Sequence, residues 1–166
     1  MTRRHFFLIA LFPVLCFTLW HFLSPARQLK AVQNRLLNAI SQKDEAACSK
    51  LIHPGYTDQW NFSPSSWPLI LKDLRALSPI LEIKLIDPVF DPTAGVVDTS
   101  LQIKASGGPA SSLIDRNGAR LKEKTRFIWK REPWRPWSWR LLSMQNPDME
   151  ALSGYQPGTL SEQSYF

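Results

Sequence analysis

The feature that most constrains this chain is an uninterrupted apolar run close to its N-terminus. Residues 6–23 contain no Asp, Glu, Lys or Arg, and Arg3 and Arg4 precede them. A run of this length is at the lower limit for a membrane-spanning helix and exceeds the apolar core of a typical signal peptide. Because basic residues favour the cytoplasmic side, we expect a cytoplasmic N-terminus, a single pass, and an extracytoplasmic domain, periplasmic or outside the cell.

The residues that follow the run leave open whether it is cleaved. Ser24-Pro25-Ala26 places small residues at the −3 and −1 positions of a cleavage after Ala26, which would give a secreted protein. Retention would give a signal-anchor, and a core helix of a soluble protein is a third interpretation. We favour retention. The predicted divisions are a signal-anchor or signal peptide over 1–26, a folded domain over 27–148 and a flexible polar tail over 149–166.

Charge, cysteine and histidine content exclude several classes of protein. The 166 residues include 20 Lys and Arg against 14 Asp and Glu, a mildly basic balance, and we expect no nucleic-acid partner. Cys16 lies in the apolar run and Cys48 in a predicted helix, so no disulfide framework forms, and we expect Cys48 to be a buried small hydrophobe. His53 is the one histidine outside the N-terminal segment, so no metal site is expected. The sequence has no Gly-rich phosphate loop and no paired Cys motif, so no other cofactor is expected.

Hydrophobic periodicity predicts three helices in the first half of the domain. The first, over 27–43, carries apolar residues at helical spacing, namely Leu29, Val32, Leu36 and Ile40. Asp44 can cap a second helix, which residues 53–55 end because Pro54 and Gly55 favour a turn. A third helix begins near Ser66 and stops at Pro79.

The period of the pattern then changes from that of a helix to that of a strand. Alternating apolar residues predict four strands, near 81–85, 97–103, 121–132 and 137–145. The stretch 106–120 is rich in Gly and Ser and is predicted to be a polar loop with a turn at Asn117-Gly118. Helices followed by strands predict an α+β fold, with three helices packed on a curved, mostly antiparallel sheet of four or more strands.

This layout and two short stretches are similar to a known superfamily. The stretches are the helix end His53-Pro54-Gly55-Tyr56 and the strand pair 126–132 and 137–141, which is rich in aromatic and basic residues. Over about 27–148 the chain resembles the nuclear-transport-factor-2-like superfamily, which includes SnoaL-like and ketosteroid-isomerase-like proteins. The resemblance implies a cone-shaped domain whose curved sheet encloses an apolar pocket. Members of the superfamily include enzymes, carriers and non-catalytic assembly modules.

Catalysis of the isomerase type would need a carboxylate base together with a Tyr and a protonated acid. The first predicted helix contains no Tyr or His, and Asp98 is in phase with the polar face of its strand. His53, Tyr56 and Asp58 remain as weak catalytic candidates, since a His beside a carboxylate can act as an acid/base pair. A helix end followed by a loop explains the same residues without catalysis, and we favour that interpretation.

Four tryptophans alternate with basic residues between positions 129 and 140. The candidates for a ligand pocket or partner surface are Phe127, Trp129, Trp134, Trp137 and Trp139. A hairpin whose rings form the inner wall of the sheet explains all of them except Trp134, at its predicted tip. For Trp134 we favour an anionic membrane surface or a protein partner over single-stranded nucleic acid, because the domain is expected to be exported.

These observations favour a non-catalytic, membrane-anchored extracytoplasmic module for binding or assembly. Its anchor-plus-domain layout is similar to that of the inner-membrane assembly factor of type IV secretion systems, and a protein partner or homodimer is expected beside the membrane contact of residues 6–23. One alternative is an isomerase- or cyclase-type enzyme with a pocket near His53 and Asp58. Another is a carrier of an apolar ligand.

Overall fold

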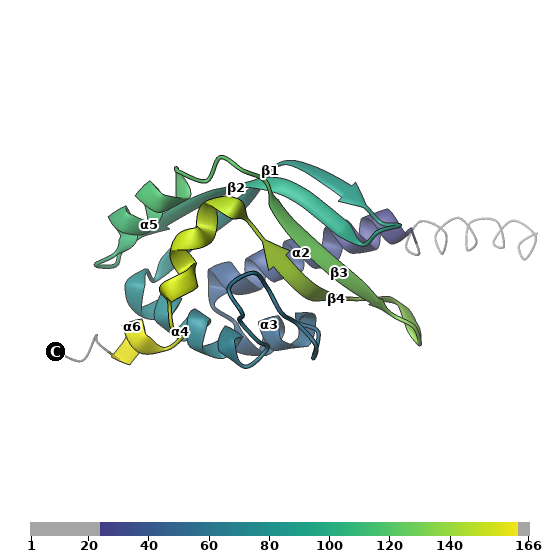
Figure 1. Ribbon diagram of the computed structural model, residues 1–166, viewed down its shortest axis with the longest axis horizontal. Coiled ribbons are helices and arrows are strands. Elements are labelled where there is room, and N and C mark those ends of the chain that lie inside the picture. The colour runs from purple at the N-terminus through teal and green to yellow at the C-terminus, as the bar shows by residue number, and fades with distance from the viewer. Residues whose placement is uncertain (1–23, 163–166) are drawn as a thin grey trace, which may run out of the picture.

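The computed structural model describes residues 24–162 (Figure 1). Its elements are α2 (Pro25–Gln42), α3 (Glu45–Leu51), α4 (Ser66–Leu77), β1 (Ile80–Asp91), β2 (Val96–Ser106), α5 (Ser111–Gly118), β3 (Thr125–Glu132), β4 (Arg135–Gln145), the 3₁₀ helix η1 (Pro147–Gly154) and α6 (Thr159–Glu162). The apolar run 6–23 lies outside the described residues. Among residues 24–162, no helix is both long enough and apolar enough to cross a membrane.

The three predicted helices are present, and local residues explain where they end. α2 buries one apolar stripe that includes Leu29 and Leu36, and it stops where Lys43 adopts a left-handed conformation with φ of 52°. The Asp44 carboxylate then caps α3 by accepting a 2.9 Å hydrogen bond from the Ala47 N–H, as the sequence predicted. α4 ends just before Pro79, which cannot continue a helix.

The four strands form a single antiparallel meander in the order β1-β2-β3-β4. α2 lies along one face of this sheet (Figure 1). That face carries buried residues such as Val97 and Phe127, whereas Asp98 and Arg126 lie on the outer face and form an ion pair of 2.8 Å. The predicted α+β architecture and the outward position of Asp98 are therefore confirmed.

The segment predicted to be a polar loop over 106–120 is instead partly helical. β3 pairs only with Val96–Thr99 of β2, so the rest of that edge of β2 needs another cover. α5 supplies it: the Asp115 carboxylate accepts a hydrogen bond from the Ala105 N–H, and Gly118 packs so closely that an added Cβ would lie 3.0 Å from Ile103. The prediction was wrong because tertiary packing, and not the composition of the loop, decides this helix.

The predicted flexible tail over 149–166 also has structure as far as Glu162. η1 and α6 return the chain to α4 (Figure 1). The buried carboxylate of Asp73 on α4 accepts hydrogen bonds from the Tyr155 hydroxyl at 2.5 Å, the Gly158 N–H at 2.8 Å and the Ser161 N–H at 2.7 Å. Polar contacts to a distant residue leave no periodic signal in the sequence, which is why the pattern missed this segment.

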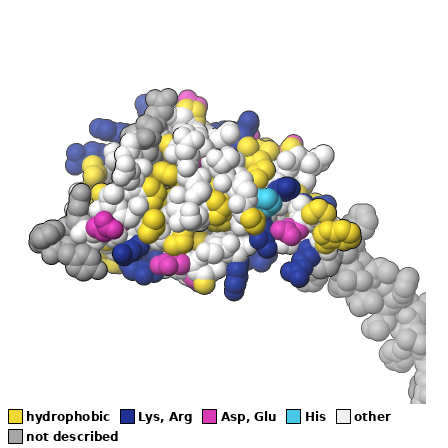
Figure 2. Space-filling view, turned by 60° about the horizontal axis from the view of Figure 1, so that its bottom comes forward, with side chains coloured by type: hydrophobic (Ala, Val, Ile, Leu, Met, Phe, Trp, Pro, Cys, Tyr) yellow, Lys and Arg dark blue, Asp and Glu magenta, His cyan; other side chains and the backbone are white. Residues whose placement is uncertain are grey.

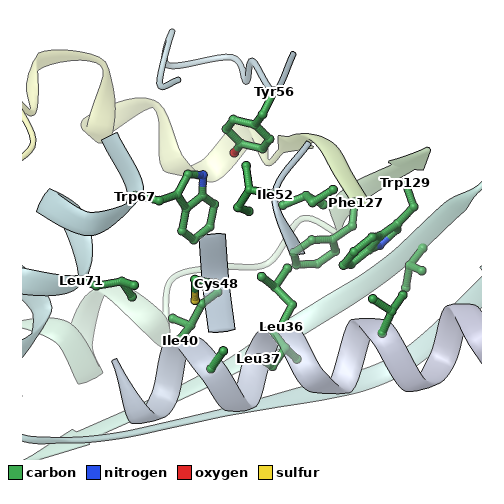
Figure 3. Close-up of a cluster of buried hydrophobic side chains, with 14 of the residues drawn as sticks. Leu36, Leu37, Ile40, Cys48, Ile52, Tyr56, Trp67, Leu71, Phe127 and Trp129 are labelled. Carbon is green, nitrogen blue, oxygen red and sulfur yellow. The ribbon is translucent and has the colours of Figure 1, made fainter. Parts of the chain in front are cut away.

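The core lies between α2, α3, α4 and the inner face of the sheet (Figure 3). Leu36 and Cys48 are fully buried, and the side chains of Phe127 and Trp129 point from β3 toward α2. Burial, followed by the nearby Asp44 charge, raises the pKa of the Cys48 thiol to about 12. Cys48 is therefore the small buried hydrophobe that the sequence predicted.

Candidate functional site: an apolar cavity between helices and sheet

A cavity of about 330 Å³ lies between the helices and the inner face of the sheet. Its wall combines α2, α4, all four strands, α5, η1 and the C-terminal segment, through residues that include Leu37, Leu74, Ile83, Leu101, Phe127 and Leu160. The surface that these described residues expose to the cavity is entirely apolar. Such a space favours an uncharged apolar occupant, because a polar group placed there would lose its hydrogen bonds to water.

Two carboxylates, Asp58 and Asp73, reach the cavity wall, and hydrogen bonds from the chain itself occupy both. Asp58 Oδ2 accepts a 2.7 Å bond from the Tyr56 hydroxyl, and its Oδ1 accepts the N–H groups of Trp60 at 3.0 Å and Phe62 at 2.9 Å. These bonds fold the loop that leads to α4. Asp58 therefore serves as a structural acceptor.

Tyr56 is buried beside Trp67, with ring centroids 5.7 Å apart in an edge-to-face arrangement (Figure 3). Burial first, and then the hydrogen bond to Asp58, raise the pKa of the Tyr56 hydroxyl well above its ordinary value. The Tyr56 proton is engaged by the Asp58 carboxylate of the same chain. Tyr56 and Asp58 are thus brought together, as the sequence suggested, in a pair that stabilises the core.

His53 does not join this pair. Its Nδ1 accepts a 2.9 Å hydrogen bond from the Gly55 N–H, which closes the turn after α3, and its imidazole is visible at the surface as the cyan group in Figure 2. The His53 backbone N–H donates to the Leu141 carbonyl oxygen at 2.9 Å and so attaches this loop to the free edge of β4. The favoured interpretation of His53 as a helix-end residue agrees with these contacts.

Asp73 is the carboxylate at this site that sequence reasoning missed. It is 1% exposed. Its burial alone would raise its pKa, but the hydrogen bonds from Tyr155, Ser161 and Gly158 outweigh burial and hold the pKa below the ordinary value. The sequence does carry a signal for it: Ile70 and Leu77, three residues before Asp73 and four after it, place Asp73 on the apolar face of α4. A carboxylate on an apolar helical face needs a buried partner.

The aromatic side chains proposed for a ligand pocket or partner surface lie at different places in the fold. Among the described aromatic side chains proposed for it, Phe127 lines the cavity, whereas Trp129 and Trp139 do not. The Trp129 indole N–H donates to Gln33 Oε1 at 2.9 Å, and Trp139 lies under the Arg131 guanidinium at 4.8 Å. The side chain of Trp137 lies outside the described part of the structure. Both described rings form the inner wall of the sheet, as the hairpin interpretation predicted.

Known structures with the same arrangement identify the fold. No protein-family profile and no curated protein sequence matches the chain. Bd1075 of Bdellovibrio bacteriovorus matches with a TM-score of 0.54 and 11% identity over 72% of this chain and 40% of its own, so this chain spans about two fifths of that protein. An NTF2-like family protein of Streptomyces avermitilis matches with a TM-score of 0.51 and 16% identity over 73% and 93%. The chain has the nuclear-transport-factor-2-like fold.

A third similar structure, PrhC of Penicillium brasilianum, matches with a TM-score of 0.52 and 12% identity over 84% of this chain and 97% of PrhC. Identities this low show the fold alone. The cavity occupies the place between sheet and helices that the resemblance implied. Part of the cavity wall comes from α5, η1 and α6, which the sequence did not predict.

Proposed function

We propose that this protein is a non-catalytic binding module, held at the outer face of a membrane by residues 6–23, whose cavity takes a small uncharged apolar ligand. The observation that carries the proposal is the cavity of about 330 Å³ with its apolar surface. Its size is at the lower end of the range of small-molecule sites, which are mostly apolar. Ligand binding also accords with the carrier alternative that the sequence left open.

The polar groups around the cavity support binding without catalysis. A general base must reach the proton of its substrate with a free lone pair at hydrogen-bonding distance. Asp58 and Asp73 each accept three hydrogen bonds from this chain, and Nδ1 of His53 accepts one from its own turn. The isomerase-type alternative therefore has less support than binding.

The experiment measures how an uncharged fluorophore, N-phenyl-1-naphthylamine, binds to the full chain in lipid nanodiscs. Ile83 lines the cavity from β1, so Ile83→Trp should fill it and weaken binding at least about tenfold, since a ring in a packed space excludes the probe. Ile86→Trp is the matched control, because Ile86 on the same strand is 41% exposed on the other face. Equal binding by the two variants, with the lipid background common to both, would contradict the proposal.

Assembly with a protein partner or a second copy is a second candidate function. The observation that favours it is the edge strand β1, where three large apolar residues are exposed: Ile80 at 61%, Ile86 at 41% and Val89 at 57%. Exposed apolar residues on a sheet edge are typical of interaction surfaces. Sedimentation of the full chain in detergent distinguishes a single copy from an assembly.

A further inference from the structure

The most exposed large apolar side chain in the described structure is an aromatic one at the tip of a hairpin. Trp134 joins β3 to β4 and is 93% exposed, compared with 61% for Ile80, the next most exposed. Its neighbours Pro133 and Arg135 are exposed as well. The core does not need this ring, since Trp129 and Trp139 already cover the inner face of the same hairpin. An indole held in water in this way is suited to a contact outside the domain.

Contacts along β3 show at which end of the domain this tip lies. Phe127 borders the cavity together with Leu37 of α2. Two residues further along β3, the Trp129 indole donates to Gln33, four residues earlier in α2. Residues nearer the C-terminal end of β3 therefore contact residues nearer the N-terminal end of α2. Figure 1 shows the same arrangement, with the β3–β4 turn and the beginning of α2 at one end of the long axis.

The tip and the start of α2 reach similar levels along this axis. The three strand steps from Trp129 to Glu132 span roughly 10 Å, and the turn residues Pro133 and Trp134 lie beyond them. The eight helical steps from Gln33 back to Pro25 span roughly 12 Å. Only Ser24 lies between Pro25 and the end of the apolar run at Leu23. At most about 7 Å of chain therefore separates the run from the helix. A membrane reached by residue 23 would also be within reach of Trp134.

The charge at this end favours an anionic partner. Exposed basic side chains lie on the hairpin and on the first turns of α2: Lys130, Arg135, Arg27 and Lys30. The carboxylates nearby are Asp87, Asp91 and Glu132. Glu132 is paired with Arg140 at 3.0 Å, and Asp91 Oδ1 accepts the N–H groups of its own turn at 2.9 and 3.0 Å. The basic side chains at this end, with Arg140 included, outnumber these three carboxylates, so its net charge is positive and suits an anionic lipid headgroup layer.

We propose that the hairpin tip, formed by Trp134 with Arg135 and Lys130, is a second contact with an anionic phospholipid membrane and sets the orientation of the domain on it. This inference rests on the proposed membrane tether. Indole rings favour the interface between headgroups and acyl chains, where basic side chains meet lipid phosphates. Ile40 at the cavity lies fifteen helical residues from Pro25, so the contact would hold the cavity roughly 20 Å from the membrane, toward the aqueous side.

The test uses the full chain in nanodiscs of phosphatidylcholine, with or without phosphatidylglycerol, in which the lipid carries bromine near the headgroup end of its acyl chains. Bromine quenches tryptophan on contact. The wild type should lose a larger share of its emission than Trp134→Phe, and the excess should come from one of its seven tryptophans. The excess should shrink in phosphatidylcholine alone and at high salt, because the attraction to anionic lipid is screened.

A matched pair of charge variants tests the basic residues. Lys130→Gln with Arg135→Gln should reduce the excess quenching, whereas Arg116→Gln with Arg120→Gln should not. The control residues are exposed in and just after α5, toward the other end of the sheet (Figure 1). Both double variants remove two charges, so a difference between them reports position and not net charge.

The same measurement separates failure of this inference from failure of the tether. Trp20 lies in the apolar run, so quenching that persists in Trp134→Phe reports the tether. Persistent quenching with no excess in the wild type would overturn the hairpin contact and leave the tether in place. Absence of all quenching would overturn both. Protection of Trp134 from acrylamide without quenching by bromine would assign the tip to a protein partner, and would likewise overturn the membrane contact.

Discussion

Asp73 shows how one residue can decide the course of a whole segment. Its carboxylate accepts three hydrogen bonds from residues 155–161. In Asp73→Asn, an NH₂ group replaces one of the two accepting oxygens. At least one of the three donors would then face another donor and lose its acceptor. We expect the free energy of unfolding to fall by about 1–3 kcal/mol, the cost of leaving buried donors without acceptors. Urea unfolding at neutral pH measures this, with faster hydrogen exchange at residues 155–161 as the local sign. Asp98→Asn, which breaks an exposed pair with Arg126, is the control and should cost less than about 1 kcal/mol.

The pH dependence of the Asp73 effect has a definite sign. The pKa of Asp73 in the folded protein lies below its ordinary value of 3.8. Its stabilisation is therefore complete above that value and is lost as the pH falls from about 4 through the folded pKa. The difference in stability between the wild type and Asp73→Asn should narrow over this window. A difference that stayed constant down to about pH 2 would contradict this assignment.

At the residue scale, the sequence predicted which residues are neighbours better than it predicted the role of each side chain. It correctly singled out Tyr56 and Asp58 as neighbours and placed Asp98 on the outer face of the sheet. It could not show that Asp58 Oδ1 accepts hydrogen bonds from two backbone N–H groups, because such bonds depend on the path of the loop. It also missed Asp73, whose partners lie more than eighty residues further along the chain.

The stability of α5 depends on its contact with β2. It covers the edge of β2 that β3 leaves open, and its Asp115 carboxylate accepts the Ala105 N–H. We expect Asp115→Ala to cost about 0.5–1.5 kcal/mol, the net value of one such hydrogen bond. Hydrogen exchange at Ala105 and across residues 111–118 should become faster, which mass spectrometry of peptides can follow. Arg116→Ala, at the next position of the same helix, should leave both unchanged, and equal exchange in the two variants would argue against this role of Asp115.

At the element scale, accuracy followed the strength of the local signal. The helix predicted over 27–43 is Pro25–Gln42, and the strand pair predicted near 121–132 and 137–145 is Thr125–Glu132 and Arg135–Gln145. These segments carry a long apolar period, which fixes both their type and the face that they bury. α5 and the C-terminal helices lack such a period and form because the rest of the fold offers them a place. The cavity wall was therefore only partly predictable.

At the scale of the whole molecule, the proposed membrane contact and the cavity lie at different levels along one axis. The start of α2 and the β3–β4 tip lie at one end, and the cavity is lined by the C-terminal part of α2 (Figure 1). On the proposed tether, the domain would contact the membrane at the first end, and the cavity would lie away from the membrane. Because Pro25 follows the apolar run after a single residue, there is almost no linker that would let the domain reach further away.

The proposed tether determines on which side of the membrane the C-terminus lies. With two arginines before the apolar run, the C-terminus should lie outside the cytoplasm. In bacterial cells, alkaline phosphatase fused after Phe166 should be active, and the fusion should stay in the membrane fraction after extraction with alkaline carbonate. A chain that lacks residues 6–23 is the control, and its fusion should be inactive and soluble. A mature N-terminus at Arg27, found by mass spectrometry, would replace retention by secretion. It would also remove the first residues of α2, so the domain would lose both its anchor and the point that sets the distance of Trp134 from the membrane.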